Sequence, residues 1–249
     1  MNGTEEEVIV KGELHSSNTD LNESIAILEE GVDHLIIEDF EQQAEYPRLH
    51  FWFQIQMWLL THFFFNRIYT DHAILKDIAN TQDADITKTR ESNSALIDNA
   101  SRTDIVTSFF VFIIFITISF LIGIRYSSWW MFIGGIASFT LGMMIPPILL
   151  RMEGSEREDD NRDEIIAGKI TNAAETGGRV VAVIGEQHRQ PVVKKLPEWI
   201  DADQRPQAYD WYHPWMLLNT GKAVVLLLTS YGILYAMLLF GLKFAAKLV

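Results

Sequence analysis

The decapeptides VIVKGELHSS (residues 8–17) and VVAVIGEQHR (residues 180–189) repeat nearly the same phrase at two distant places in the chain. Each is a run rich in Val and Ile that reaches a glycine, and each has a histidine three residues after that glycine. Val and Ile are typical of buried strands, and glycine often marks the end of a strand. The sequence therefore predicts two strands that each place a histidine, His15 or His188, just beyond their carboxyl end.

The first phrase opens a β-α-β unit. The strand at residues 7–12 is followed by LNESIAILEE (residues 21–30), an amphipathic helix, and then by DHLIIED (residues 33–39), a second buried strand. Near the second phrase, a helix over residues 161–175 leads into a strand at 179–185. This pattern predicts an α/β domain with a mostly parallel sheet and helices on both faces.

Two polar stretches separate these elements. Residues 68–103 are polar and are expected to be helical. The acidic run EGSEREDDNRDE (residues 153–164) can be interpreted as a region that binds divalent cations or as a solvated linker. The linker is the favoured interpretation, because the run has no ordered ligand spacing.

The composition excludes several kinds of site. The net charge is −13, and no cluster of cations is present to bind phosphates, so nucleic acid is excluded as a partner. The chain has no cysteine, which excludes disulfides, thiolate metal sites and cysteine nucleophiles. The first ten residues, MNGTEEEVIV, are acidic and do not resemble a signal peptide. Any metal site must therefore be built from His, Asp and Glu.

Three segments are long and apolar enough to cross a membrane. Residues 105–124 contain no charged residue and match the thickness of a hydrocarbon core. Residues 129–150 follow after a turn of only four residues, so the two segments predict a tight transmembrane hairpin. A third span is expected at about 223–242. The fifteen residues 51–65 are too short for a comfortable span and predict an interfacial or buried helix instead.

A hairpin returns the chain to the side from which it left. The α/β domain is therefore expected in two halves, residues 1–104 and 151–214, around the hairpin at 105–150. The last segment, 215–249, carries the C-terminal transmembrane helix. The apolar helix within the first half is assigned to residues 51–66.

Ligands of parallel sheets gather at the carboxyl ends of the strands. His15 and His188 follow the two phrases, and Glu38 and Asp39 end the strand at 33–39. Arg162 and Asp163 begin the helix before the second phrase, and the N-terminus of such a helix lies at the same edge. Because all of them belong to this edge, we expect these residues to form one site.

The spacing Gly-x-x-His is weak evidence without its position after a strand. Gly12–His15 and Gly185–His188 follow predicted strands, but Gly31–His34 has the same spacing and precedes one. His34 is therefore expected at the opposite edge of the sheet. A histidine after a strand is also commonly just a structural hydrogen-bonding residue, so the pairing of two such motifs carries the argument.

These residues resemble the TraB/PrgY family and its relatives, the TIKI metalloproteases and, more remotely, the erythromycin esterases. The resemblance rests on the two Gly-x-x-His motifs, on Glu38 in LIIEDF and on the pair Arg162-Asp163, and covers roughly residues 7–40 and 158–195. Glu13 and Glu186, which lie inside the two motifs, set this chain apart from the pattern.

The resemblance to TIKI proteins implies metal-dependent peptide hydrolysis. His15, His188 and Glu38 form a two-histidine, one-carboxylate set that suits Zn²⁺, Mn²⁺ or Fe²⁺. The resemblance to the esterases implies instead a metal-free reaction, in which a histidine activates water and a glutamate assists.

The remaining candidate residues are assigned supporting roles. Arg162 is expected to bind a substrate carboxylate or to stabilise an oxyanion. Glu186 is a candidate catalytic residue, and either it or Glu13 is a candidate additional ligand or base. Solvent-exposed or indirect roles remain open for both glutamates. Glu13, Asp39 and Asp163 are the candidate substrate-binding residues, and Gly12 and Gly185 are the motif glycines.

Two functions remain open from the sequence. The first is a membrane-anchored hydrolase that acts on a peptide or an ester, and the second is a non-catalytic membrane regulator that binds a signal peptide or small ligand. Either would be a multi-pass protein of the cell membrane, with the lipid bilayer as its first partner and a homo-oligomer as a further option. The charged residues beside the spans favour a cytoplasmic α/β domain only slightly.

Overall fold

The computed structural model describes residues 7–40, 50–68, 72–90, 100–125, 128–210 and 212–247, and for residues 151–161 it describes the backbone alone. The chain forms two compact units. The sheet unit comprises Met1–Ala44, Ile68–Asn93 and Arg157–Asn219. The helical unit comprises Glu45–Arg67, Ser94–Glu156 and Thr220–Val249.

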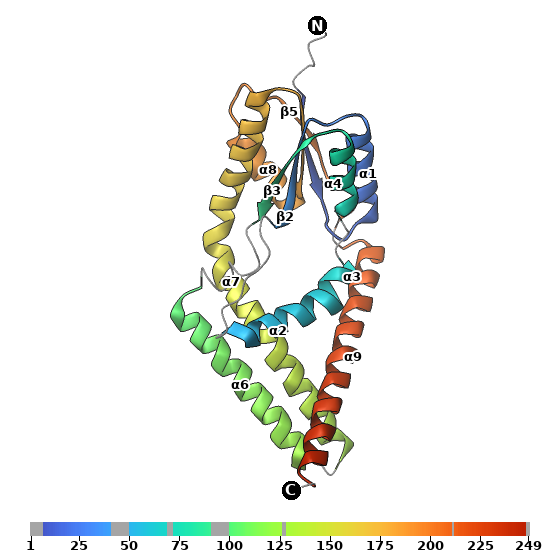
Figure 1. Ribbon diagram of the computed structural model, residues 1–249, viewed down its shortest axis with the longest axis vertical. Helices are drawn as coiled ribbons and strands as arrows, with labels where there is room; N and C mark the ends of the chain where they lie inside the picture. The colour runs from blue at the N-terminus through green and yellow to red at the C-terminus, as the bar shows by residue number, and fades with distance from the viewer. Residues whose placement is uncertain are drawn as a thin grey trace. The chain divides into compact units, whose positions relative to one another are not determined.

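The sheet unit is built on a five-stranded, all-parallel sheet with the strand order β3-β2-β4-β1-β5 (Figure 1). This confirms the expected α/β class. The strands are β1 (Glu7–Glu13), β2 (His34–Phe40), β3 (Asp85–Arg90), β4 (Arg179–Gly185) and β5 (Ala202–Arg205).

The strand order brings the two repeated phrases side by side. β1 and β2 are parallel, as the β-α-β pattern predicts, but they are not neighbours, because β4 lies between them. In this arrangement Glu13 pairs with Gly185 in the β1–β4 register. The strand that ends in the second motif therefore lies between the strand that ends in Glu13 and the strand that contains Glu38.

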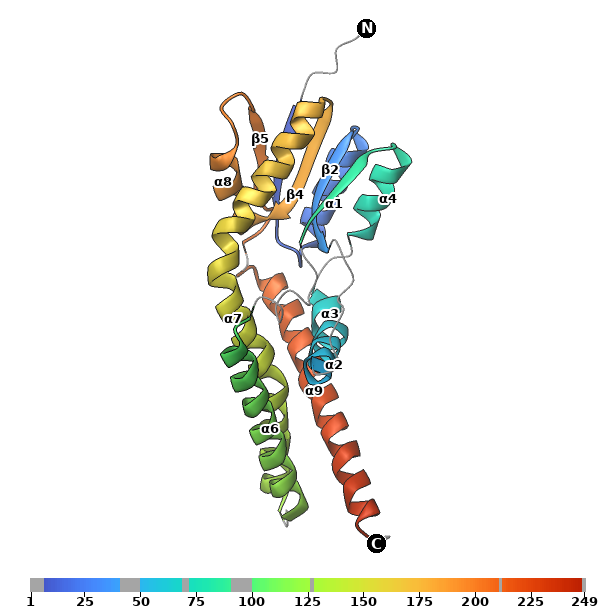
Figure 2. The same cartoon turned by 60° about the vertical axis from the view of Figure 1, so that its left-hand side comes forward.

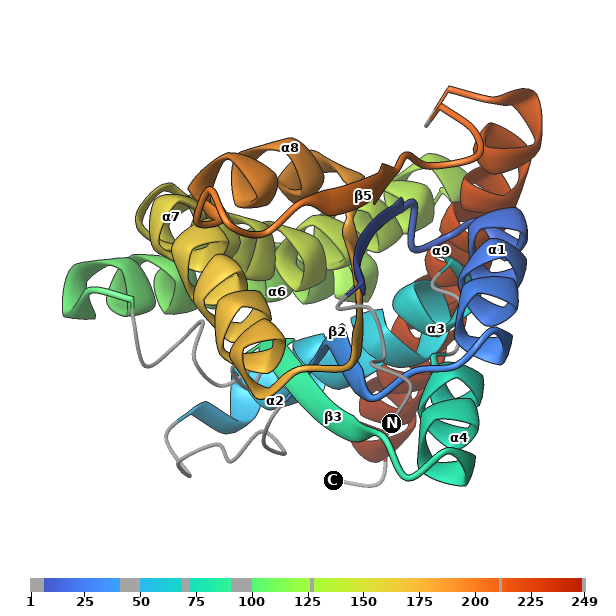
Figure 3. The same ribbon diagram turned by 90° about the horizontal axis from the view of Figure 1, so that it is seen from above.

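Helices cover both faces of the sheet (Figure 3). α1 (Asn18–Glu29) and α4 (Ala73–Thr81) pack on one face, and the end of α7 together with α8 (Glu186–Lys195) packs on the other. Successive side chains of a strand point to opposite faces, so continuous apolar strands are needed to fill both layers. β4, with the sequence RVVAVIG, meets this need, and its residues from Val180 onward are buried.

One expectation from the sequence needs correction in the sheet unit, and two further elements, β5 and α8, were not expected. The segment 68–103 is not only helical, because it contains the strand β3 after α4. β5 was not expected, since its four residues, ADQR, are polar and mostly exposed. His188 lies in the first turn of α8, because that helix begins directly after Gly185.

α7 (Trp129–Thr176) is a single helix of 48 residues, which contributes to both units. The expected linker at 153–164 is therefore wrong: the run is helical throughout. Glu, the commonest residue of this run, is a good helix former. The helix ends before Gly177 and Gly178, which adopt φ values of +80° and +97° that favour glycine.

The helical unit holds three helices that are long and apolar enough to cross a membrane by length and composition. They are α6 (Arg102–Arg125), the Trp129–Leu150 part of α7, and α9 (Pro214–Ala245). Each contains one of the three spans expected from the sequence. α2 (Phe51–Leu60) continues through the π-helix η2 (Thr61–Phe65) into α3 (Asn66–Ile68), which confirms a helix at 51–66 (Figure 2).

Small residues let the apolar helices approach closely. The hydroxyl of Tyr235 on α9 is buried and donates to the carbonyl of Ser119 on α6 at 3.0 Å. A side chain at Gly123 or at Gly135 would overlap this hydroxyl. In addition, Ser119 Oγ donates to the carbonyl of Gly135 at 2.8 Å, which links α6 to α7.

Candidate functional site

The carboxyl ends of β1, β2 and β4 bring three predicted site residues together. A Cβ placed on Gly185 would lie 3.4 Å from His15 Nε2, 3.7 Å from Glu38 Oε2 and 3.7 Å from His188 Cδ2. Gly185 thus ends β4 in the middle of this group, and the positions of all three follow from the parallel strand order.

His15 lies between two buried carboxylates. Its Nδ1 donates to Glu13 Oε1 at 2.8 Å, and its Nε2 donates to Glu38 Oε2 at 2.9 Å. Both glutamate side chains are only 1% exposed, whereas the His15 side chain is 18% exposed. The histidine is therefore the member of this group that solvent can reach.

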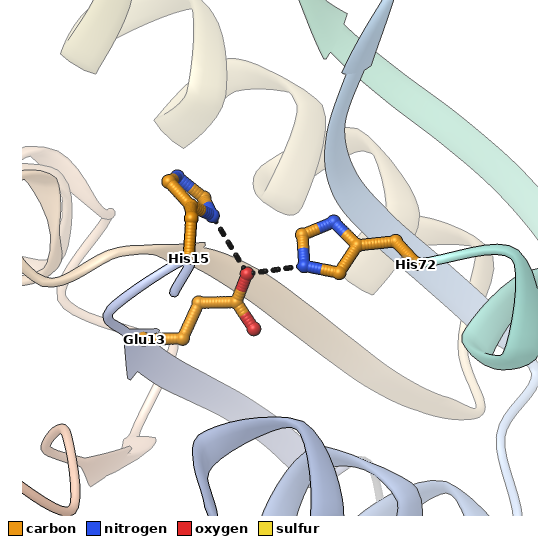
Figure 4. Close-up of side chains that lie close together, drawn as sticks. All are labelled: Glu13, His15 and His72. Carbon is orange, nitrogen blue, oxygen red and sulfur yellow. Dashed lines mark hydrogen bonds and ion pairs between the residues drawn. The ribbon is translucent and has the colours of Figure 1, made fainter. Parts of the chain in front are cut away.

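A second histidine contacts the same carboxylate. His72, the residue before α4, places its Nε2 2.6 Å from Glu13 Oε1 (Figure 4). The imidazole rings of His72 and His15 have centroids 5.7 Å apart. Glu13 thus lies between two imidazoles that come from different segments of the chain.

The pKa values of Glu13 and His15 follow from this arrangement. Burial alone would raise the pKa of Glu13, but hydrogen bonds from His15 and His72 lower it to about 2. Burial alone would lower the pKa of His15, but hydrogen bonds to Glu13 and Glu38 raise it to about 9. In the absence of any other cation, His15 is therefore protonated at neutral pH.

Arg162 approaches Glu38 from the end of α7 that packs on the sheet. Its terminal nitrogen lies 2.8 Å from Glu38 Oε1, and its side chain is 18% exposed. Arg162 Nε is buried and makes no hydrogen bond to any residue that the structure describes. The guanidinium therefore has a donor available for a bound anion or oxyanion.

His188 has its own partners beside this group. Its Nδ1 lies 2.7 Å from Asp163 Oδ1, and its Nε2 lies 3.0 Å from the side-chain nitrogen of Gln187. His188 is 4% exposed and Asp163 is 9% exposed. Of the His188 atoms, Cδ2 rather than a nitrogen comes nearest to a Cβ placed on Gly185.

Glu186 is held by an ion pair instead of facing His15. Both of its carboxylate oxygens accept hydrogen bonds from Arg189, and one also accepts from the backbone of Gln207. This pair lies against β1 at Gly12, where a side chain would overlap the Glu186 carboxylate. A side chain at position 12 would therefore have to displace the carboxylate of Glu186.

Asp39 lies between two lysines. Its carboxylate is 2.8 Å from the amine of Lys76 on α4 and 3.4 Å from that of Lys88 on β3. The predicted substrate-binding residues therefore fall in three places: Glu13 beside His15, Asp163 beside His188, and Asp39 in this ion-pair group.

The donors around Glu13 suit a divalent ion. Glu13, His15 and His72 each offer one ligand atom, and these atoms all lie within 4.8 Å of one another. Glu13 Oε2 is buried without a hydrogen bond to any described residue. Two imidazoles and a carboxylate are a donor set that binds Zn²⁺, Mn²⁺ or Fe²⁺.

His72 is the site residue that the sequence did not reveal. It follows no Val- or Ile-rich strand, has no Gly-x-x-His spacing and lies 57 residues after His15. The one available signal was its position directly before the amphipathic segment AILKDIANT, since a residue at a helix start can lie at the same sheet edge as the strand ends.

In comparisons with known proteins, no family model, curated protein or solved structure matches the chain. The resemblance to the TraB/PrgY family therefore rests on the motif residues alone and stays a prediction.

Proposed function

We propose that the chain is a membrane-anchored, metal-dependent hydrolase that cleaves a peptide or an ester at the carboxyl edge of its sheet. The observation that carries the proposal is the position of His15 between the buried carboxylates of Glu13 and Glu38. Burying several ionisable groups is costly unless they are paired, and such clusters are frequent at functional sites. The TraB/TIKI-like motifs favour the same activity.

The residues of the edge supply the roles that hydrolysis requires. A divalent ion, when bound, would polarise the substrate carbonyl and lower the pKa of water. Glu38 accepts a proton from the attacking water, whose oxygen forms a bond to the carbonyl carbon. The C–N or C–O bond then breaks, and the leaving amine or alcohol takes that proton. The guanidinium of Arg162 stabilises the negative charge that develops on the carbonyl oxygen.

The membrane anchor is inferred from the surface of the apolar helices. The most apolar stretch of α6 has a mean hydropathy of 2.8, yet only 11% of this stretch is buried. Its large apolar side chains, such as Val106, Phe110 and Leu121, are more than half exposed. Exposed apolar surface of this extent is stable in a bilayer and unfavourable in water. The lipid bilayer is thus the first partner of the chain.

The test is hydrolysis of a panel of fluorogenic peptides and p-nitrophenyl esters by the purified full chain in detergent micelles. We expect turnover that EDTA abolishes and that added Zn²⁺ or Mn²⁺ restores. Arg162→Lys should reduce turnover by about 10²–10³-fold, the usual effect of losing an oxyanion donor, without lowering the metal content. Arg205→Lys is the matched control, because Arg205 is exposed and pairs only with Asp203 among the partners that the structure describes.

A chain that binds metal but hydrolyses nothing in the panel would contradict the proposal. That result would favour the non-catalytic alternative, a membrane protein that binds a peptide or small ligand at the same edge. Equal turnover by the wild type and Arg162→Lys would exclude the assigned role of Arg162.

A further inference from the structure

We infer that Glu13, His15 and His72 are the protein ligands of a divalent ion, and that Glu38 and His188 lie outside the ligand set. This assignment rests on the metal dependence of the proposed function but not on the hydrolytic step. It replaces the set His15, Glu38 and His188 that the motifs suggest.

The three ligands come together from separate parts of the sheet unit. Glu13 ends β1, and His15 lies in the turn after it. His72 directly precedes α4, which packs on the same face of the sheet as α1. His15 Nδ1 and His72 Nε2 lie 2.8 Å and 2.6 Å from the same oxygen, Glu13 Oε1 (Figure 4). Three ligand atoms from different segments thus already lie within 4.8 Å of one another.

The second observation is the remaining oxygen of Glu13. Oε2 is buried, and no residue that the structure describes donates a hydrogen bond to it. An unpaired buried carboxylate oxygen is costly, because it has lost its hydration. A divalent ion bound through either or both oxygens of Glu13 would remove this cost.

Glu38 fits the role of a residue that orients a ligand. A histidine that binds metal through one ring nitrogen usually donates the N–H of the other to a carboxylate, which fixes the ring and its tautomer. His15 has this arrangement: Nδ1 faces Glu13, and Nε2 is 2.9 Å from Glu38 Oε2. Arg162 in turn holds the other oxygen of Glu38. Glu38 can then take the proton in the proposed reaction without competing for the ion.

His188 is less suited to bind the same ion. The group of ligand atoms that lie within 4.8 Å of one another does not include His188, whose Nδ1 is 2.7 Å from Asp163 and whose Nε2 is 3.0 Å from Gln187. By contrast, the Glu13 group needs only a small adjustment. Ligand atoms in a tetrahedral zinc site lie about 3.3 Å apart, given bonds of about 2.0 Å. The nitrogens of His15 and His72, now 2.8 Å and 2.6 Å from Glu13 Oε1, would therefore withdraw from it by about 0.5 Å and about 0.7 Å.

The experiment measures metal binding by the EDTA-treated full chain in detergent micelles, using Zn²⁺ titration calorimetry and the visible spectrum of bound Co²⁺. We expect one ion per chain in the wild type. His72→Ala and Glu13→Gln should each lower the affinity by more than about 100-fold, whereas Glu38→Gln should lower it by about 10–100-fold, as loss of an orienting carboxylate does. His188→Ala should bind like the wild type. His34→Ala is the matched control, because His34 begins β2 at the opposite edge of the sheet.

Three results would overturn the assignment. They are the absence of stoichiometric Zn²⁺ in the wild type, unchanged affinity in His72→Ala, and a large loss of affinity in His188→Ala. If His72→Ala fails to fold, X-ray absorption of zinc-loaded His188→Ala decides the question: two imidazole ligands are expected, and one would contradict the assignment. Zinc binding is measured without substrate, so a chain that binds zinc through these ligands but hydrolyses nothing would refute only the proposed function.

Discussion

At the scale of single residues, the most informative feature is that His15 donates hydrogen bonds to two carboxylates that are buried away from water. Glu13 and Glu38 each accept a hydrogen bond from this one ring, and His72 approaches Glu13 from the other side. In the metal-free protein, the positive charge of protonated His15 compensates the negative charges of Glu13 and Glu38. The stability of the metal-free fold is therefore linked to pH.

The linkage predicts a loss of stability in the alkaline range. The folded-state pKa of His15, about 9, is above its ordinary value of 6.5, so its contribution is complete below pH 6.5 and is lost as the pH rises through about 9. At about 2–4 °C per kcal/mol for chains of this size, the thermal-unfolding midpoint of EDTA-treated protein should fall by several degrees between pH 6.5 and 9. His15→Asn should weaken this dependence, and an identical slope in both proteins would contradict the prediction.

The same pair has an acidic limit. The pKa of Glu13 is depressed from 4.5 to about 2, so its contribution is present above pH 4.5 and is lost as the pH falls toward 2. The two shifts share the interaction between Glu13 and His15 and are therefore not additive. Together they predict that this pair contributes most to the stability of the metal-free protein between about pH 4.5 and 6.5.

At the scale of elements, the close approach of α6, α7 and α9 depends on where small residues fall. Gly135 faces the hydroxyl of Tyr235, while its neighbour Gly134 has open space around the position of a side chain. Between transmembrane helices, close packing of this kind contributes much of the association energy. The hydrophobic effect contributes little, because an apolar side chain is equally well placed against lipid and against another helix.

Gly135→Ala and Gly134→Ala form a matched pair that tests this contact. Gly135→Ala should destabilise the helical unit by about 1–3 kcal/mol, the usual cost of overpacking, because the new methyl group overlaps the ring of Tyr235. Gly134→Ala should be neutral or slightly stabilising. The measurement is the thermal-unfolding midpoint in detergent, and equal midpoints for the two variants would exclude the contact.

Some elements could be predicted from the sequence because they carry strong local signals. VIV, LII and VVAVI are continuous apolar runs, and each forms a buried strand at its predicted place. β3 and β5 could not be predicted from an apolar run, because DITKTR and ADQR are mostly polar. Both are edge strands, and each pairs with only one neighbouring strand. His72 was missed for a related reason: its role depends on the position of α4 in the fold, and no local pattern encodes that position.

At the scale of the whole molecule, the three apolar helices predict a defined topology. If α6, the start of α7 and α9 each cross the bilayer, the turn before Trp129 and the C-terminal end share one side, and the sheet unit lies on the other. Because the chain has no cysteine, single substitutions give unambiguous labelling sites. Suitable exposed positions are Ser128, Ala245 and Asp201.

A maleimide that cannot cross the membrane should label Ser128→Cys and Ala245→Cys from the same side of sealed vesicles. Asp201→Cys should be labelled only from the opposite side. Labelling of all three positions from one side would contradict the crossing of α6 and α7. For a cytoplasmic sheet unit, the reagent should reach positions 128 and 245 in intact cells.

The place of β4 between β1 and β2 also has a consequence for the order of events during synthesis. β1 and β2 leave the ribosome early, but the strand that joins them is made only after α6 and the whole of α7. Until β4 arrives, β1 and β2 have no shared neighbour, and Glu13 and Glu38 cannot be brought to one edge. The nascent chain therefore cannot bring Glu13 and Glu38 to one edge of the sheet before both apolar helices, α6 and the Trp129–Leu150 part of α7, have been made.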